Sequence, residues 1–226
     1  IFELMWRDFF RFYCVKHGND VFKLEGPKNM RRQWSRDSKL IEAWKNGRTG
    51  VPWVDANMRE LQATGFMSNR GRQNVASYLV HDLKVDWRYG ADHFESMLLD
   101  HDVCSNYGNW VAAAGLNGGR INRFNMSKQA NDYDKQGRYV KLWCPELNGI
   151  PEKAIHSPWR LTTADQQHVN CVIGQDYPCP IVTPKTSYNG GGGNNFRNGA
   201  RNNRKAKNFK GKGRVHRGRG QDFYTS

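Results

Sequence analysis

The sequence predicts an all-α domain over residues 1–186, followed by a disordered basic tail over residues 187–226. In the first part, apolar residues recur at helical spacing, and no run alternates apolar with polar residues as a half-buried strand would. All eight tryptophans lie at or before Trp159, whereas the tail consists mostly of Gly, Asn, Arg and Lys. Such a composition cannot bury enough apolar surface to fold.

The first helix is expected over residues 1–17, where nothing interrupts the helical turns. One face is apolar at helical spacing and consists of Leu4, Met5, Phe9, Phe12 and Val15. The opposite face carries a carboxylate, an indole, a guanidinium and a phenyl ring, which belong to Glu3, Trp6, Arg7 and Phe10. Because the chain begins without Met inside this helix, we take its first residue as a truncation point.

Further helices are expected after an irregular polar stretch, residues 19–39. Beyond Gly115 the chain becomes looser, and Pro145, Pro151 and Pro158 divide it into short helical or irregular pieces. Five helices are expected between these two regions. The first covers about residues 38–46, and the second begins with a cap at Asp55 and ends at Gly65. The third runs through Val75, Leu79 and Leu83, and the last two cover residues 90–99 and 105–114.

The net charge of the chain is +14, and most of it lies in the tail, which holds ten Lys or Arg residues and a single acid, Asp222. A flexible basic arm suggests a polyanionic partner, and nucleic acid is the commonest one. Phe196 and Phe209 add rings on which bases can stack, so the tail is expected to bind RNA or DNA without reading its sequence. Excess solubilising charge and a nuclear import signal around residues 201–212 are the alternatives.

The five cysteines include no CxxC pair, which favours a reducing, intracellular compartment without separating nucleus, cytoplasm and organelle. No apolar run is long enough to cross a bilayer, and the N-terminus shows no cleavable leader. No membrane partner is therefore expected.

Two segments, residues 69–72 and 100–110, place charged and polar residues beside strongly apolar ones. Charged groups in such surroundings need partners, and Arg72 with Asp100 or Asp102 would be a natural pair. Taken alone, these residues favour a structural ion pair or a helix cap over a binding site.

The phrases around these residues are recognisable in order. GFMSNRGRQ and CSNYGNW, within the run from GRTGVPW to NYGNW, closely resemble the flavin-binding helical domain of photolyases and cryptochromes, and in particular its DASH branch. The resemblance starts at FELMWRDFFRF, extends to about QDYPCPIV and covers about four fifths of the chain. It implies FAD as the cofactor and, in the complete protein, an antenna pterin (methenyltetrahydrofolate) bound outside this sequence.

In the family, FAD lies folded within the helical domain, and the residues around it correspond here to Asn69, Arg72, Asp100, Asp102 and Asn106. These residue types suit an isoalloxazine ring, which presents donor and acceptor atoms at fixed positions. Asn106 corresponds to the residue facing flavin N5, where plant photoreceptor cryptochromes carry Asp. Because an amide cannot deliver a proton as a carboxylic acid can, Asn106 favours anionic reduced flavin, and hence repair over pure signalling.

Trp34, Trp87 and Trp110 correspond to the three family tryptophans along which electrons pass from the surface to excited flavin. Core packing is the alternative for each of them. Their contexts RRQWS, VDWRYG and NYGNW match the three family positions, so electron transfer that photoreduces resting FAD is the favoured role.

The resemblance places the substrate, a cyclobutane pyrimidine dimer flipped out of its strand, against Glu3, Trp6, Asn69, Arg70 and Gln73. Glu3 would hydrogen-bond the dimer, Trp6 would form an apolar wall and Arg70 would meet a phosphate. Ala112 departs from the family, which usually has an aromatic second wall there, and Phe66 replaces a Trp, as in other DASH proteins. A wider pocket that binds the lesion more weakly is expected.

The expected function of the complete protein is light-driven repair of cyclobutane pyrimidine dimers by an electron from reduced FAD, preferably in single-stranded DNA, where flipping costs less. Because the electron returns, the enzyme would be a carbon–carbon lyase of the deoxyribodipyrimidine photolyase type. One alternative is a blue-light photoreceptor that signals through flavin photoreduction. Another is a light-independent RNA- or DNA-binding protein that kept the fold.

Overall fold

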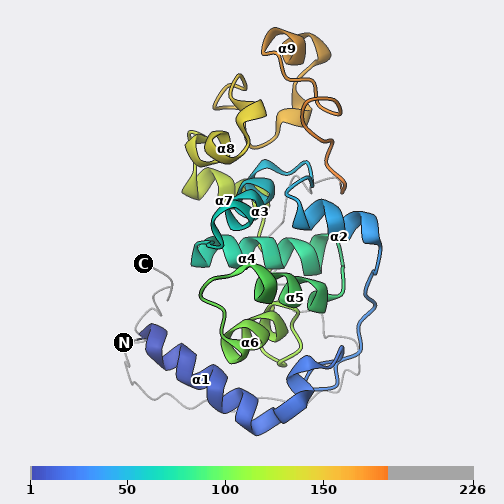
Figure 1. Cartoon of the computed structure of the whole chain (residues 1–226). Helices are drawn as coiled ribbons and strands as arrows, with labels where there is room; N and C mark the ends of the chain where they lie inside the picture. The colour runs from blue at the N-terminus through green and yellow to red at the C-terminus, as the bar shows by residue number, and fades with distance from the viewer. Residues whose placement is uncertain (1, 183–226) are drawn as a thin grey trace, which may run out of the picture. The chain divides into compact units, whose positions relative to one another are not determined.

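The computed structural model describes residues 2–182, all of which belong to the first of two units, Ile1–Tyr188. These residues are helical and contain no strand beyond isolated bridges, which confirms the all-α fold (Figure 1). The expected tail, residues 187–226, lies outside the described residues. The α-helices are α1 (Phe2–His17), α2 (Ser38–Lys45), α3 (Pro52–Thr64), α4 (Asn69–Ser77), α5 (Trp87–Met97), α6 (Val103–Ala113), α7 (Met126–Tyr133), α8 (Arg138–Trp143) and α9 (Thr163–His168).

Short turns of other helix types join these elements: η1 (Gly18–Phe22), η3 (Pro145–Leu147) and η4 (Pro158–Arg160) are 3-10 turns. The helix expected through Val75, Leu79 and Leu83 is interrupted, because α4 passes into a π-helical turn, η2 (Tyr78–Asp82). After this wider turn the chain changes direction, and Val85 forms an isolated bridge with Ser35. The Ser35 amide donates to the Lys84 carbonyl at 2.7 Å.

The core is organised around α3, most of which is buried. This helix packs against α2, α4, α7 and α8, and α4 in turn contacts α6. Figure 1 shows α3, α4, α5 and α6 following one another toward α1, which lies against α6. α3 ends at Gly65, whose φ of 69° suits a residue without Cβ, as expected. No helix of the described part is long and apolar enough to cross a membrane.

The apolar face of α1 is exposed in this chain. The side chains of Leu4, Met5, Phe9, Phe12 and Val15 remain between 51% and 82% accessible. The buried residue of α1 is Phe10, which the sequence placed on the opposite face. Periodicity reveals which face of a helix is apolar, but it does not reveal what covers that face.

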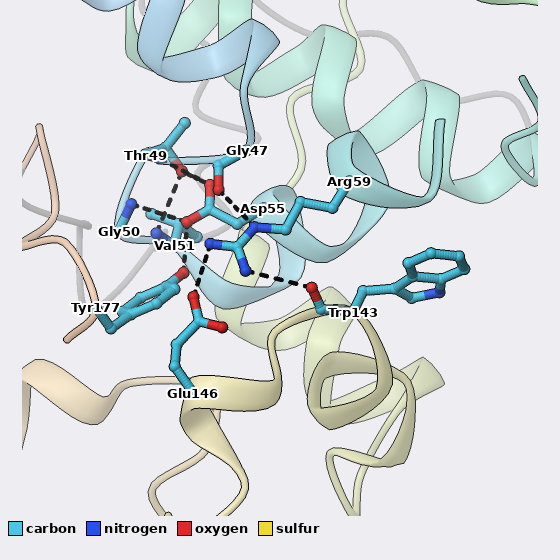
Figure 2. A network of polar contacts seen from close by, with 9 residues as sticks. All are labelled: Gly47, Thr49, Gly50, Val51, Asp55, Arg59, Trp143, Glu146 and Tyr177. Atoms are coloured by element: carbon cyan, nitrogen blue, oxygen red, sulfur yellow. Dashed lines mark hydrogen bonds and ion pairs between the residues drawn. The ribbon is translucent and has the colours of Figure 1, made fainter. Parts of the chain in front are cut away.

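Asp55 was expected to cap a helix, and this expectation is wrong, because α3 begins at Pro52 after Val51. Its carboxylate is fully buried and instead binds the loop before the helix (Figure 2). The amide and hydroxyl of Thr49 donate to Oδ1 at 2.8 and 2.6 Å, and the Gly50 amide donates to Oδ2 at 3.0 Å. The Tyr177 hydroxyl donates to the same carboxylate from the far end of the described chain.

This cluster of polar contacts fastens the segment around Tyr177 to the start of α3. Burial is the largest influence on Asp55 and raises its pKa, against the hydrogen bonds from Thr49 and Tyr177, which lower it. Close by, Arg59 donates to the Gly47 carbonyl at 3.0 Å and pairs with Glu146 at 2.8 Å (Figure 2). Three separate parts of the chain are therefore held together by two ionisable side chains of α3.

Acidification from pH 7 to pH 5 is expected to lower the free energy of unfolding, because the imidazole of His93 is held neutral. Burial lowers its pKa to about 4, against about 6.5 in an unfolded chain. The unfolded chain thus binds more protons in this window, so the contribution of His93 is complete above about pH 6.5 and is lost toward pH 4. After allowance for its remaining solvent contact, the loss at pH 5 is about 1 kcal/mol.

Urea titrations at the two pH values measure this loss. His93→Phe keeps a ring against Trp44, which His93 meets edge-on at 5.6 Å, but cannot titrate. The variant should lose less stability on acidification than the unchanged protein, and an equal loss would contradict the assignment to His93.

Candidate functional site

The first turn of α6 places two of the expected flavin residues. Asp102 is the N-cap of α6, and its Oδ1 accepts the Ser105 amide at 2.8 Å. This hydrogen bond is the main reason why the pKa of Asp102 lies below its ordinary value, so the carboxylate stays ionised. Asn106 donates its Nδ2 to the Ala91 carbonyl of α5 at 3.0 Å. That bond orients the amide and leaves its oxygen as the acceptor for a neighbouring group.

Arg72 pairs with Asp100, one of the two carboxylates that the sequence offered as its partner. Arg72 Nη2 reaches both carboxylate oxygens of Asp100, at 3.0 and 2.8 Å, while its Nε donates to the Met67 carbonyl at 2.8 Å. The Asp100 side chain is 57% exposed, so the pair lies at an open edge rather than in the core. Asn69, at the first position of α4, is exposed as well.

His101, between the two carboxylates, was missed by the sequence analysis. Both of its ring nitrogens are shielded from solvent and have no hydrogen-bond partner among the described residues. Apart from this shielded imidazole, Arg72, Asp100, Asp102 and Asn106 supply a guanidinium, two carboxylates and an amide, a mixture of donors and acceptors that suits a flavin ring.

α1 brings the expected substrate residues to the neighbouring face of α6. Phe10 packs on Gly108 so closely that a Cβ at position 108 would lie 2.3 Å from the Phe10 ring. Trp6 stacks on Phe10 at 5.9 Å and remains 47% exposed, as an apolar wall requires. Arg7 pairs with Asp8 at 3.2 Å. Glu3 lies in the first turn of α1, and its side chain is outside the described part.

Arg70 and Gln73 lie on the same helix, one turn apart. Arg70 Nη1 donates to Gln73 Oε1 at 3.0 Å. The Arg70 guanidinium also lies over the rings of Tyr133 and Phe124, two residues that the sequence analysis did not connect with it.

The three expected electron-transfer tryptophans occupy different depths. Trp87 and Trp110 are buried, at 0% and 2% exposure, and Trp87 donates its Nε1 to the Leu24 carbonyl at 3.2 Å. Trp34 is half-buried and precedes Ser35, whose backbone runs beside residues 84–86, next to Trp87. The structure thus places the backbone next to Trp34 beside the segment that leads into Trp87.

A fourth tryptophan, Trp44, contacts Trp110 edge-on at 6.2 Å. Trp44 is buried and donates its Nε1 to the Val75 carbonyl at 3.0 Å. Nothing in its sequence context separated it from an ordinary core tryptophan. The structure also places the two residues at which this sequence differs from the usual family pattern. Ala112 is half-buried on α6, and Phe66, which is 53% exposed, lies just after α3.

The comparisons with known proteins identify the family of this chain. Residues 1–190 match the family described as the FAD binding domain of DNA photolyase. This chain belongs to the photolyase/cryptochrome family. The family's helical fold, the resemblance to its DASH branch and FAD as its cofactor are thereby confirmed.

The individual relatives cover this chain well. Cryptochrome DASH of Danio rerio is 52% identical over 229 residues, which is 100% of this chain and 44% of that protein. The crystal structure of a cryptochrome from Synechocystis sp. PCC6803 has a TM-score of 0.78 at 51% identity, over 80% of this chain and 38% of that one. A class III photolyase from Agrobacterium tumefaciens has a TM-score of 0.74 at 35% identity, over the same shares. The chain therefore spans less than half the length of these relatives.

Proposed function

We propose that the full-length protein repairs cyclobutane pyrimidine dimers with light, preferably in single-stranded DNA, and is a deoxyribodipyrimidine photolyase. The observation that carries the proposal is the position of α6 between α5 and α1. On one side of α6, the Asn106 amide is oriented by its hydrogen bond to α5. On the other side lies α1, which carries the exposed ring of Trp6. A flavin-edge residue and a substrate-wall residue thus flank one helix. A flipped dimer has to contact both walls of such a site.

In this proposal, bound FAD in its reduced state supplies the light-driven electron. The Asn106 amide cannot donate a proton to flavin N5 as a carboxylic acid could. Asn106 would therefore leave the reduced flavin anionic, the form that gives up an electron to the lesion and takes it back. Trp6 excludes water from one side of the dimer, and Glu3 is the proposed hydrogen-bond partner of the lesion carbonyls. Asn69 and Gln73 are the proposed polar contacts to the lesion from α4. Trp34, Trp87 and Trp110 are proposed to keep the cofactor in its active state.

One observation favours a second function, that of a blue-light photoreceptor. Ala112 provides no ring at the position where the family usually has an aromatic second wall. A pocket open on that side would bind a flipped dimer less tightly, whereas photoreduction through the tryptophans would be unaffected.

The deciding experiment gives the full-length protein with reduced flavin a dimer-containing single-stranded oligonucleotide in light and in darkness. Repair predicts loss of dimers in light alone, because the electron leaves only an excited flavin. Trp6→Leu should slow this loss by weakening lesion binding, whereas Trp143→Leu, on the distant helix α8, should not. Equal dimer content in light and in darkness would sink the repair function and leave photoreception as the better reading.

A further inference from the structure

Arg70 lies against two aromatic rings from a distant part of the chain. Its guanidinium carbon is 5.0 Å from the centroid of the Tyr133 ring and 5.9 Å from that of Phe124. Tyr133 is the last residue of α7, and Phe124 lies in the loop before that helix. A guanidinium in contact with an aromatic face is attracted to the ring, which holds Arg70 in one orientation.

The position of Tyr133 is set by contacts other than the one with Arg70. Asn74 on α4 donates its Nδ2 to Gln129 Oε1 on α7 at 3.2 Å, and the Phe124 amide donates to the Ser77 hydroxyl at 3.1 Å. Met126 and Ala130 anchor α7 in the core. α7 is therefore held on α4 whether or not Tyr133 carries a ring.

The Tyr133 ring nevertheless remains 53% exposed. Residues 120–138 around it contain five basic residues and two acidic ones. Two of the basic residues are paired, Arg123 with Asp82 and Lys128 with Asp132, which leaves the segment with a modest positive excess. An exposed ring beside a cation offers partners for both halves of a nucleotide: the base stacks on the ring, and the phosphate meets the positive charge.

We propose that Tyr133 is a stacking platform for an unpaired base of a single-stranded nucleic acid, with Arg70 beside it to contact a phosphate. The proposal rests on the nucleic-acid partner of the proposed function and adds a binding residue outside the lesion site. Binding of a base by Tyr133 requires no lesion and no light, and it does not depend on the redox state of the flavin. A base inside a duplex is already stacked on its neighbours, so Tyr133 discriminates in favour of single strands.

The test measures binding of the full-length protein, in the dark, to an undamaged oligothymidine and to a duplex, over a series of salt concentrations. Tyr133→Leu should weaken single-strand binding about 5- to 100-fold, because a stacked base is lost, and should leave duplex binding nearly unchanged. The dependence of affinity on salt should stay the same, since a ring releases no counterions. Tyr133→Phe, which keeps the ring, should bind as the unchanged protein does.

Arg70→Gln is the matched comparison. It should lower the salt slope on the single strand by about 0.7, the value for one lost phosphate contact. If Tyr133→Leu lowers the slope in the same way, Tyr133 merely orients Arg70, and the proposal is overturned. Unchanged single-strand affinity in Tyr133→Leu also overturns it. Tyr133→Gln, a second ring-free variant, guards against a folding defect of the leucine variant, and thermal unfolding checks both.

The two proposals fail separately. Absence of light-driven dimer loss, with Tyr133-dependent binding of undamaged single strands, would remove the repair function and keep the platform. The opposite result would keep repair and remove the platform.

Discussion

Alanine in place of Asp55 should lower the free energy of unfolding by about 3–5 kcal/mol, a large part of the stability of a typical domain. The buried carboxylate is the common acceptor for the Thr49 amide and hydroxyl, the Gly50 amide and the Tyr177 hydroxyl. Removing it leaves all these donors enclosed without a partner, and each one costs free energy in that state. The free energy of unfolding, from guanidinium titration followed by circular dichroism, measures the effect.

Tyr177→Phe is the control for this prediction. It removes one donor and keeps the ring, so a cost of about 1–2 kcal/mol is expected. The double variant should cost less than the two single costs together, because both remove the same hydrogen bond. A cost below about 1 kcal/mol for Asp55→Ala would show that water replaces the carboxylate and that the cluster does not fasten the C-terminal segment.

Arg72→Ala, in the full-length protein, should weaken FAD binding about 10- to 100-fold, since a hydrogen bond from a charged group contributes about 1.5–3 kcal/mol. Arg72 is fixed by Asp100 and by the Met67 carbonyl, which leaves its planar group oriented at the exposed edge of the site. Arg72→Lys should not restore the affinity, because an ammonium cannot reproduce the planar fork. Titration of the flavin-free protein with FAD gives the dissociation constant.

Arg138→Ala, which changes an exposed arginine on α8, is the matched control and should bind FAD normally. Thermal unfolding separates loss of the cofactor from loss of the fold. FAD affinity in Arg72→Ala equal to that of the unchanged protein would reduce the Arg72–Asp100 pair to a structural ion pair, the alternative that the sequence left open.

Local sequence patterns were sufficient for most helices and for an ion pair of Arg72 with one of two carboxylates, and the structure selects Asp100 over Asp102. The end of α3 at Gly65 was predictable because a left-handed residue after a helix favours glycine. The start of α3 was not, because Asp55 is a good capping residue whose actual partners are set by tertiary contacts. The interruption of α4 by η2 was missed for a similar reason: spacing of four residues does not distinguish an α-helix from one that ends in a π turn.

The resemblance supplied the expected flavin residues, but the contacts between distant segments came from the structure alone. Asp55 and Tyr177 are 122 positions apart in the sequence. Arg70 contacts Tyr133 although α5 and α6 lie between them in the sequence. Neither partner carries a local signal, since a buried tyrosine and an exposed one look alike in a sequence. Trp44 likewise became distinguishable only through its contact with Trp110.

The exposed apolar face of α1 has a consequence for hydrogen exchange. Phe10 is the only side chain of α1 that is buried among the described residues, whereas most of α3 is enclosed. The amides of α1 should therefore exchange through local openings long before those of α3, which should exchange only on global unfolding. Glu3 and Trp6, the proposed lesion contacts, thus lie on a helix that opens far more readily than α3, and a partner that covered its outer face would also steady the wall that would receive the dimer.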